Sequence, residues 1–108
     1  MTGTVQIKRG TRGVVFHPET WYRSEMHRLN LVVKETAPEG YDPVITSGCE
    51  GRHSDDPWSK HYTGWALDYG IHGLTEEDII NWVDQIKVAL GDKYYVLLEG
   101  NHIHTHVV

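Results

Sequence analysis

The stretch YYVLLEGNHIHTHVV (94–108) decides the fold, because it has the pattern of two strands joined by a tight turn. Tyr94 to Leu98 is aromatic and aliphatic, Gly100 and Asn101 suit a turn, and His102 to Val108 alternates imidazole with other side chains. Successive side chains of a strand point to opposite faces. We therefore expect a closing antiparallel hairpin whose last strand carries three imidazoles on one face: His102, His104 and His106.

The rest of the chain predicts helices and strands that pack with this hairpin. In chain order we expect an irregular arm or short strand over residues 1–15, a helix from Pro18 to about Glu35, a strand at Val44–Thr46, a strand at Trp65–Ile71 and a helix between Thr75 and Gly91. The order predicts a single α+β domain, residues 1–108, in which a small antiparallel sheet packs with two helices.

Composition excludes several classes of function. The net charge of -5 argues against a nucleic-acid partner, and no apolar run reaches the roughly 18 residues of a membrane span. The single cysteine, Cys49, excludes an internal disulfide and a cluster of metal-binding thiolates. The start MTGTVQIKRG has no hydrophobic segment, so we expect no secretory signal and synthesis in the cytoplasm. We also expect a monomer.

Two stretches carry the chemistry, SKHYTGWALDYG (59–70) and LLEGNHIHTH (97–106). Asp68 lies in an otherwise apolar strand, where an unpaired carboxylate is costly to bury. One zinc ion would satisfy it, with His61, Asp68 and a histidine of the last strand as the three protein ligands of a catalytic site. From these residues alone, an adventitious metal site on an edge strand and a chance cluster of histidines stay open. The helix-borne motif H-E-x-x-H is absent.

The string S-x-H-x-x-G-x-A-x-D, here Ser59 to Asp68, resembles the metal motif of the D-Ala-D-Ala metallopeptidases. This family includes bacterial D-Ala-D-Ala carboxypeptidases and dipeptidases and phage L-Ala-D-Glu endolysins. EGNHIHTH (99–106) resembles its second motif, an acid followed by a His-x-His pair, and ITSGCEGRH (45–53) resembles an upstream segment that ends in a basic residue. The resemblance covers about residues 43–108 and implies the fold shared with the hedgehog signalling domain, with one zinc ion as cofactor.

The resemblance also implies a ligand set. His61 and Asp68 match the first two zinc ligands of the family. For the third, members with E-x-x-H would select His102, whereas members ending in a His-x-His pair use the later histidine, and we expect His104. His106 departs from the family pattern; we expect it to be exposed, although it could compete for the ion.

Roles for other residues follow from the same resemblance. Glu99 matches the catalytic acid and base, which takes a proton from the attacking water and returns it to the leaving amine. Arg52 is expected to stabilise the oxyanion of the tetrahedral intermediate, with His53 as the next choice. His53, His102 and Ser59 are expected to bind substrate, and Ser59 would also orient its own loop.

The resulting expectation is zinc-dependent hydrolysis of a peptidoglycan stem-peptide or cross-link bond, by an endopeptidase or a D-Ala-D-Ala carboxypeptidase. By analogy, the small size resembles a phage lysis or virion-associated enzyme that acts on the cell wall. One alternative is a non-catalytic structural or binding module of the same fold, stabilised by zinc, for example in a phage virion. Another is a domain that binds no zinc.

Overall fold

The computed structural model describes residues 6–7, 13–50 and 59–108. Within these residues the strands are β1 (Gln6–Ile7), β2 (Val44–Ser47), β3 (Ala66–Gly70), β4 (Tyr94–Glu99) and β5 (His102–Val107). The helices are the short 3-10 helix η1 (Thr20–Tyr22), α1 (Ser24–Thr36) and α2 (Glu76–Leu90). The expected α+β class and its two α-helices are therefore confirmed.

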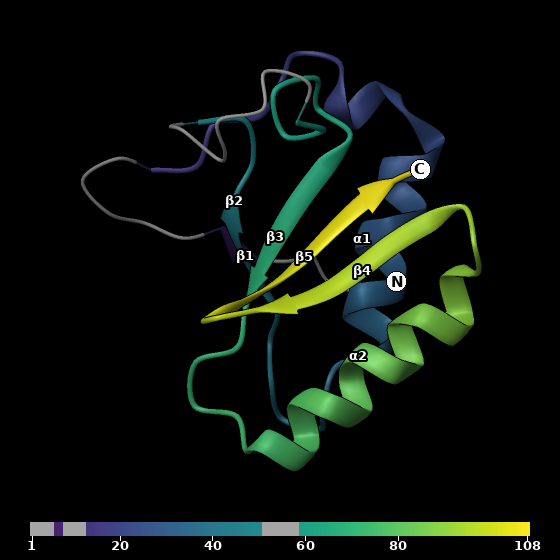
Figure 1. The fold of residues 1–108 in the computed structure, drawn as a ribbon. Helices are drawn as coiled ribbons and strands as arrows, with labels where there is room; N and C mark the ends of the chain where they lie inside the picture. The colour runs from purple at the N-terminus through teal and green to yellow at the C-terminus, as the bar shows by residue number, and fades with distance from the viewer. Residues whose placement is uncertain (1–5, 8–12, 51–58) are drawn as a thin grey trace.

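The strands form one mixed sheet in the order β1-β2-β3-β5-β4. The pairs β2–β3, β3–β5 and β5–β4 are antiparallel, as expected. The expectation of a wholly antiparallel sheet is wrong at one edge, where β1 pairs parallel with β2. The reason is the connection: α1 follows β1 and carries the chain behind the sheet before β2 begins (Figure 1), and parallel neighbours require such a crossover.

The first α-helix begins later than the sequence pattern predicts. Residues Thr20–Tyr22 form a 3-10 turn, and Arg23 is extended, with φ -100° and ψ 121°, immediately before α1. The Arg23 side chain is held by a distant part of the chain. Its guanidinium donates to the Thr63 carbonyl at 2.8 Å and lies 3.9 Å from the centroid of the Trp65 ring. The helical pattern that starts at Pro18 is therefore interrupted at Arg23, the residue whose side chain makes this tertiary contact.

The second α-helix has the caps that its sequence predicts. The hydroxyl of Thr75 accepts a hydrogen bond from the backbone N–H of Asp78 at 3.1 Å. At the other end, Gly91 adopts a positive φ of 76°. In the described part of the chain, neither α-helix combines the length and the apolar character that crossing a membrane requires.

The hydrophobic core lies between the two α-helices and one face of the sheet. Its sheet side comprises Ile45, Leu67, Tyr69, Val96 and Ile103, and its helix side includes Met26, Leu29, Val33, Trp82, Ile86 and Leu90. Figure 1 shows α1 behind the sheet and α2 below β4. Because side chains alternate along a strand, the neighbouring residues of β3 and β5 point to the opposite face, away from this core. That second face carries the polar side chains.

Candidate metal centre

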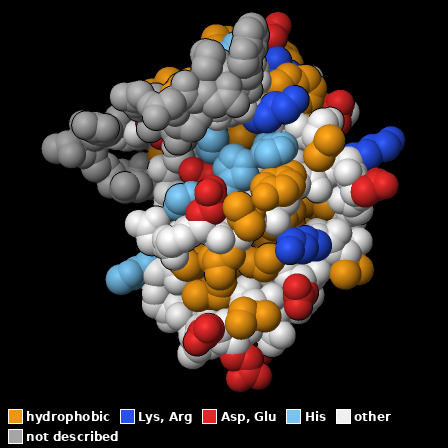
Figure 2. Space-filling view, in the orientation of Figure 1, with side chains coloured by type: hydrophobic (Ala, Val, Ile, Leu, Met, Phe, Trp, Pro, Cys, Tyr) orange, Lys and Arg blue, Asp and Glu red, His pale blue; other side chains and the backbone are white. Residues whose placement is uncertain are grey.

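The sheet face opposite the helices gathers histidines from the last strand. Three cross-strand pairs of β3 and β5 lie on it: Ala66 with His106, Asp68 with His104, and Gly70 with His102. In Figure 2, histidine side chains (pale blue) cluster at the centre of this face, with acidic side chains (red) at their edge and hydrophobic ones (orange) below. The expected row of imidazoles on one face is therefore present, with a carboxylate directly opposite its middle member.

His61, Asp68 and His104 meet at one point. Nε2 of His61 lies 3.2 Å from Oδ1 of Asp68 and 3.0 Å from Nδ1 of His104. The third side of this triangle, from Nδ1 of His104 to Oδ1 of Asp68, is 3.1 Å. His61 and Asp68 are buried, with 3% and 6% of their surface exposed. These three side chains form a group that could hold a metal ion.

A tight turn brings His61 to the sheet. The backbone N–H of Gly64 donates to the His61 carbonyl at 3.2 Å, and Gly64 has a φ of 79°, which side chains other than glycine's rarely adopt. The Ser59 hydroxyl accepts the backbone N–H of His61 at 3.4 Å, which is the local orienting contact expected of it. On the ring itself, Nδ1–H of His61 donates to the carbonyl of Gly48 at 2.8 Å.

Glu99 and His102 lie beside this group. Oε1 of Glu99 is 3.6 Å from Nε2 of His102 and 3.9 Å from Nδ1 of His104. Nε2 of His102 is also 3.6 Å from Oδ2 of Asp68, so the two oxygens of this carboxylate face different histidines. The side chain of Glu99 is 47% exposed. An acid is thus placed next to the three converging groups and remains open to a molecule that arrives from solvent.

No family model, curated protein or solved structure matched this chain in our comparisons. The hydrogen bond between Nδ1 of His61 and the Gly48 carbonyl shows which nitrogen of this ring carries a proton.

The converging atoms could act as ligands of a cation. Because a carbonyl only accepts hydrogen bonds, Nδ1 of His61 carries the proton of the neutral ring, and Nε2 presents a lone pair. This lone pair faces Oδ1 of Asp68 and Nδ1 of His104, two further electron-rich atoms. Such an arrangement is repulsive unless a proton or a metal cation lies among the three atoms. The donor set therefore fits a cation.

The ionisation of the metal-free group reflects the same charges. Burial on its own raises the pKa of Asp68, but its hydrogen bonds with His104 and His61 outweigh burial and hold that pKa far below the usual range. Burial lowers the pKa of His61, but the hydrogen bond and charge of Asp68 outweigh it, so that pKa is raised. Asp68 is therefore anionic over the whole physiological range, and His61 holds a proton more tightly than an ordinary histidine.

A cavity of about 650 Å³ opens beside the group and includes Asp68 and His102 in its walls. Its other lining residues include Ser47 and Asn101 and three apolar side chains: Ile71, Leu74 and Ile79. A cavity of this size is in the range of small-molecule and peptide binding sites. It therefore offers a place for a ligand within reach of Glu99 and His102.

The structure brings most of the predicted site residues together. His61, Asp68 and His104 form the group, with Glu99 and His102 next to it, and Ser59 lies in the turn that carries His61. Arg52 and His53, expected to act on the oxyanion and substrate, lie outside the described residues.

The expectation that His106 is exposed is wrong. Its Nδ1 lies 2.7 Å from Nε2 of His104, and its ring stacks on Tyr95 with centroids 4.8 Å apart and an angle of 16° between the planes. Burial and the neighbouring cationic groups, chiefly those of His104 and Lys60, lower the pKa of His106 to about 4. Its position opposite small Ala66 and large Tyr95 explains why it is half-buried.

Three further residues of the site were not predicted. The Gly48 carbonyl orients His61, and the carboxylate of Glu50 accepts the backbone N–H groups of Gly48 at 2.7 Å and Val15 at 3.0 Å. Tyr95 supports His106. Of these, only Tyr95 had a signal in the sequence, since pairing across the Gly100–Asn101 turn sets it opposite His106. Main-chain groups such as the Gly48 carbonyl leave no residue-type signal.

Proposed function

We propose that the chain is a zinc-dependent peptidase that cleaves a peptide bond of bacterial peptidoglycan. The carrying observation is that His61, Asp68 and His104 converge while Oε1 of Glu99 lies 3.9 Å from Nδ1 of His104. Three protein ligands beside a partly exposed carboxylate are the pattern of catalytic zinc sites. The resemblance of Ser59–Asp68 and of residues 99–106 to the peptidase motifs supports the same function and supplies the substrate class.

The donor set suits zinc in particular. With zinc–nitrogen and zinc–oxygen bonds of about 2.0–2.1 Å, tetrahedral ligands stand roughly 3.3 Å apart. The separations of 3.0, 3.1 and 3.2 Å among the three atoms are close to this value. Nε2 of His61, Oδ1 of Asp68 and Nδ1 of His104 would hold the ion, which supplies a lowered pKa for water and a positive charge for the carbonyl oxygen when bound.

The other residues of the site have roles that follow from their positions. Glu99 Oε1 takes a proton from the attacking water and returns it to the nitrogen of the leaving amine. His102 Nε2, 3.6 Å from Glu99, hydrogen-bonds the substrate on the side of the cavity. The cavity that contains Ile71, Leu74 and Ile79 receives the residues of the peptide next to the cleaved bond. We also propose that the chain has the same fold as the hedgehog signalling domain.

The test uses purified protein on bacterial peptidoglycan and on defined muropeptides, with the fragments identified by mass spectrometry. Glu99→Gln is the matched variant because it preserves shape and removes the proton acceptor. We expect the wild type to release peptide fragments, a chelator to stop the release, and Glu99→Gln to hold one zinc ion with a rate at least about 100-fold lower. If neither protein releases fragments while both hold one zinc, a zinc-stabilised binding module replaces the peptidase.

The muropeptide products also separate the two versions of the activity. Loss of a terminal D-Ala identifies a carboxypeptidase, whereas cleavage between L-Ala and D-Glu or within a cross-link identifies an endopeptidase. Absence of stoichiometric zinc from the wild type in elemental analysis would refute both versions.

A further inference from the structure

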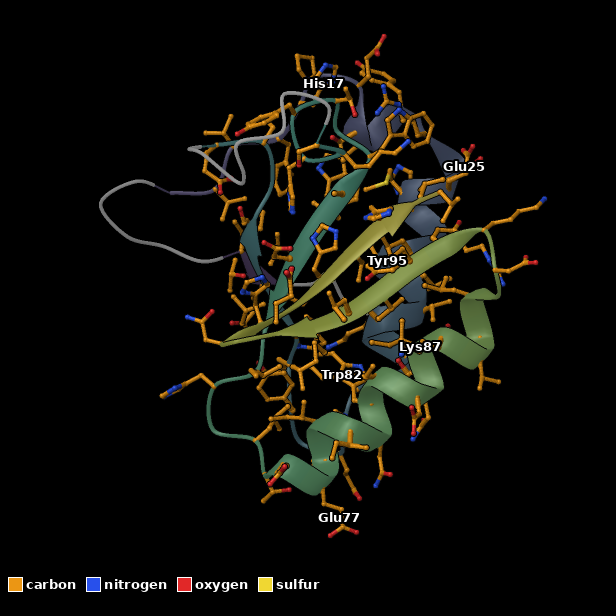
Figure 3. The ribbon with its side chains drawn as sticks, in the orientation of Figure 1. His17, Glu25, Glu77, Trp82, Lys87 and Tyr95 are labelled. Carbon is orange, nitrogen blue, oxygen red and sulfur yellow. The ribbon has the colours of Figure 1, made fainter. Side chains whose placement is uncertain are left out.

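Both ring nitrogens of His104 have a partner. Its Nδ1 faces Asp68 and His61 at 3.1 and 3.0 Å, and its Nε2 lies 2.7 Å from Nδ1 of His106. Figure 3 labels Tyr95, which comes from the neighbouring strand β4 and supports His106 by stacking. The contact between His104 and His106 joins two residues of the same strand face and lies on the side away from the three converging atoms.

When Nδ1 of His104 binds a cation, its proton is on Nε2, and the contact with His106 gives that proton an acceptor. A neutral imidazole carries one N–H, and a ligating nitrogen must offer a lone pair. If Nδ1 of His104 is the ligand, the proton is on Nε2 and donates to Nδ1 of His106. Histidines that bind metals generally donate their other N–H to an acceptor, and that partner sets both the tautomer and the ring orientation.

The position of His106 is itself well defined. Its ring stacks nearly parallel on Tyr95, with 4.8 Å between centroids, and the facing residue on β3 is Ala66, which is 1% exposed. A large aromatic residue on one side and a small one on the other leave room for one imidazole between β3 and β4. Packing thus fixes the plane of the His106 ring, and the contact with His104 selects the ring orientation in which Nδ1 faces Nε2 of His104.

We propose that His106 is a positioning residue, which holds the proton of His104 on Nε2 and thereby presents Nδ1 to the metal ion. The inference rests on the proposed zinc site, but not on any catalytic activity. It also assigns a function to the one histidine of the last strand that the metal triangle and the cavity do not use. Ligation of the ion by His106 itself is the opposing outcome, because asparagine can replace a hydrogen-bond acceptor but not an imidazole that binds zinc.

Two substitutions distinguish the effect of the hydrogen-bond acceptor of His106 from the effect of its aromatic ring. His106→Phe preserves an aromatic ring against Tyr95 but removes the acceptor. His106→Asn loses the ring but places a carbonyl oxygen near the position of Nδ1. His27→Phe on the distant helix α1 is the matched control for removing a histidine. Zinc affinity is measured for all four proteins by competition with a chromophoric chelator, and the ring nitrogens are observed by 15N NMR of zinc-loaded protein.

We expect zinc affinity to fall about 10–100-fold in His106→Phe, as is typical when a residue that orients a ligand is removed. His106→Asn should recover most of this loss, and His27→Phe should bind zinc as the wild type does. In the wild type, the Nε2 proton of His104 should be visible and protected from exchange with water, and it should exchange rapidly in His106→Phe.

Equal zinc affinity of the wild type and His106→Phe would overturn the role of His106. So would equal losses in His106→Phe and His106→Asn, because the acceptor would then make no difference. Complete loss of stoichiometric zinc in both variants would make His106 a ligand and refute the proposal. A wild type that binds zinc but cleaves no peptide would overturn the proposed peptidase alone and leave the comparison of affinities valid.

Discussion

Asp68 on β3 is paired directly with His104 on β5, and its Oδ1 lies 3.1 Å from Nδ1 of that histidine. The pairing is fixed by the backbone hydrogen bonds of two central strands, so the two side chains need little rearrangement to act together. His61 completes the group from a turn outside the sheet. Strand register thus fixes the relative position of Asp68 and His104. It favours His104 over His102 as the metal ligand from the last strand, and this choice can be tested.

The first prediction concerns His104 and His102, the two candidates for the third ligand. We expect His104→Ala to lose stoichiometric zinc on dialysis, because its Nδ1 belongs to the donor triangle. The loss of affinity should exceed the roughly 10–100-fold typical of a residue that only orients a ligand. His102→Ala should retain one zinc ion, since Nε2 of His102 lies at 3.6 Å from the outer oxygen of Asp68. Elemental analysis of both variants decides, and the reverse result would give the ligand role to His102.

The second prediction concerns the stability of the metal-free protein between about pH 6 and 8. Asp68 raises the pKa of buried His61, so the folded protein holds this proton more tightly than the unfolded chain. The resulting stabilisation is fully present below the unfolded pKa of about 6.5 and is lost as the pH rises through the raised folded pKa. Chelator-treated wild type should therefore lose more stability than Asp68→Asn over this range, as measured by thermal unfolding. Equal pH dependence in the two proteins would contradict the pairing of these side chains.

Zinc should reverse this dependence on pH. Protons compete with the metal for the histidine ligands, so zinc affinity should fall as the pH drops through the raised pKa of His61. The carboxylate of Asp68 stays ionised there, because its pKa is far below the usual range. A metal content that is the same at about pH 4.5 and pH 7 would exclude this ligand set.

The third prediction concerns Gly64, in the turn that carries His61. A Cβ at this position would lie 2.5 Å from Cβ of His17 and 2.7 Å from Oγ1 of Thr20, and the φ of 79° disfavours other residues. Gly73 has a similar φ of 84° but nothing within 4 Å of such a Cβ, so Gly73→Ala measures the backbone cost alone, about 1–2 kcal/mol. We expect Gly64→Ala to be more destabilising than Gly73→Ala by roughly 1–3 kcal/mol in urea unfolding. Equal costs would show that the crowding around Gly64 is relieved by small shifts.

The fourth prediction concerns Glu50, whose carboxylate accepts hydrogen bonds from the Ser47 hydroxyl and from the backbone N–H groups of Gly48 and Val15. Glu50→Gln would set an amide NH₂ against some of these donors. We expect a loss of about 1–3 kcal/mol of stability, compared with less than about 0.5 kcal/mol for Glu39→Gln on the surface. Urea denaturation measures both, and similar small effects would show that the loop does not depend on Glu50.

Acid should weaken the same contacts. Burial raises the pKa of Glu50, but the hydrogen bonds from Ser47, Gly48 and Val15 outweigh it, and the pKa is lowered. The contribution of Glu50 is therefore present above the unfolded pKa of about 4.3 and is lost as the pH falls through the lower folded value. The difference in stability between wild type and Glu50→Gln should shrink accordingly in acid.

Local chemistry was predictable from the sequence, and long-range pairing was less so. The N-cap Thr75 and the C-cap Gly91 of α2 are recognisable within the segment itself, and the structure confirms both. The mixed character of the sheet depends on β1 meeting β2 after a helix, a contact that no local pattern encodes. The first helical pattern is likewise interrupted at Arg23, whose guanidinium donates to the carbonyl of Thr63, 40 residues away in the sequence.

The candidate site shows the same division. Alternation along the last strand predicts that its histidines share a face, and the motif predicts that His61 and Asp68 belong with them. The cover of His106 by Tyr95 follows from the register of the hairpin, which pairs these two residues on either side of the Gly100–Asn101 turn. The acceptor for Nδ1–H of His61 is the backbone carbonyl of Gly48. Every residue has such a carbonyl, so the residue type at position 48 does not predict this contact.

His61 and His104 are 43 positions apart in a chain whose sole thiol is Cys49. A metal ion that binds both would link them and close a loop of the intervening chain, as a disulfide would. By analogy with a disulfide spanning a similar length, such a closure removes about 4 kcal/mol of conformational entropy from the unfolded chain. For a small domain of marginal stability, the same ion would then serve both as reagent and as the cross-link that keeps the chain folded.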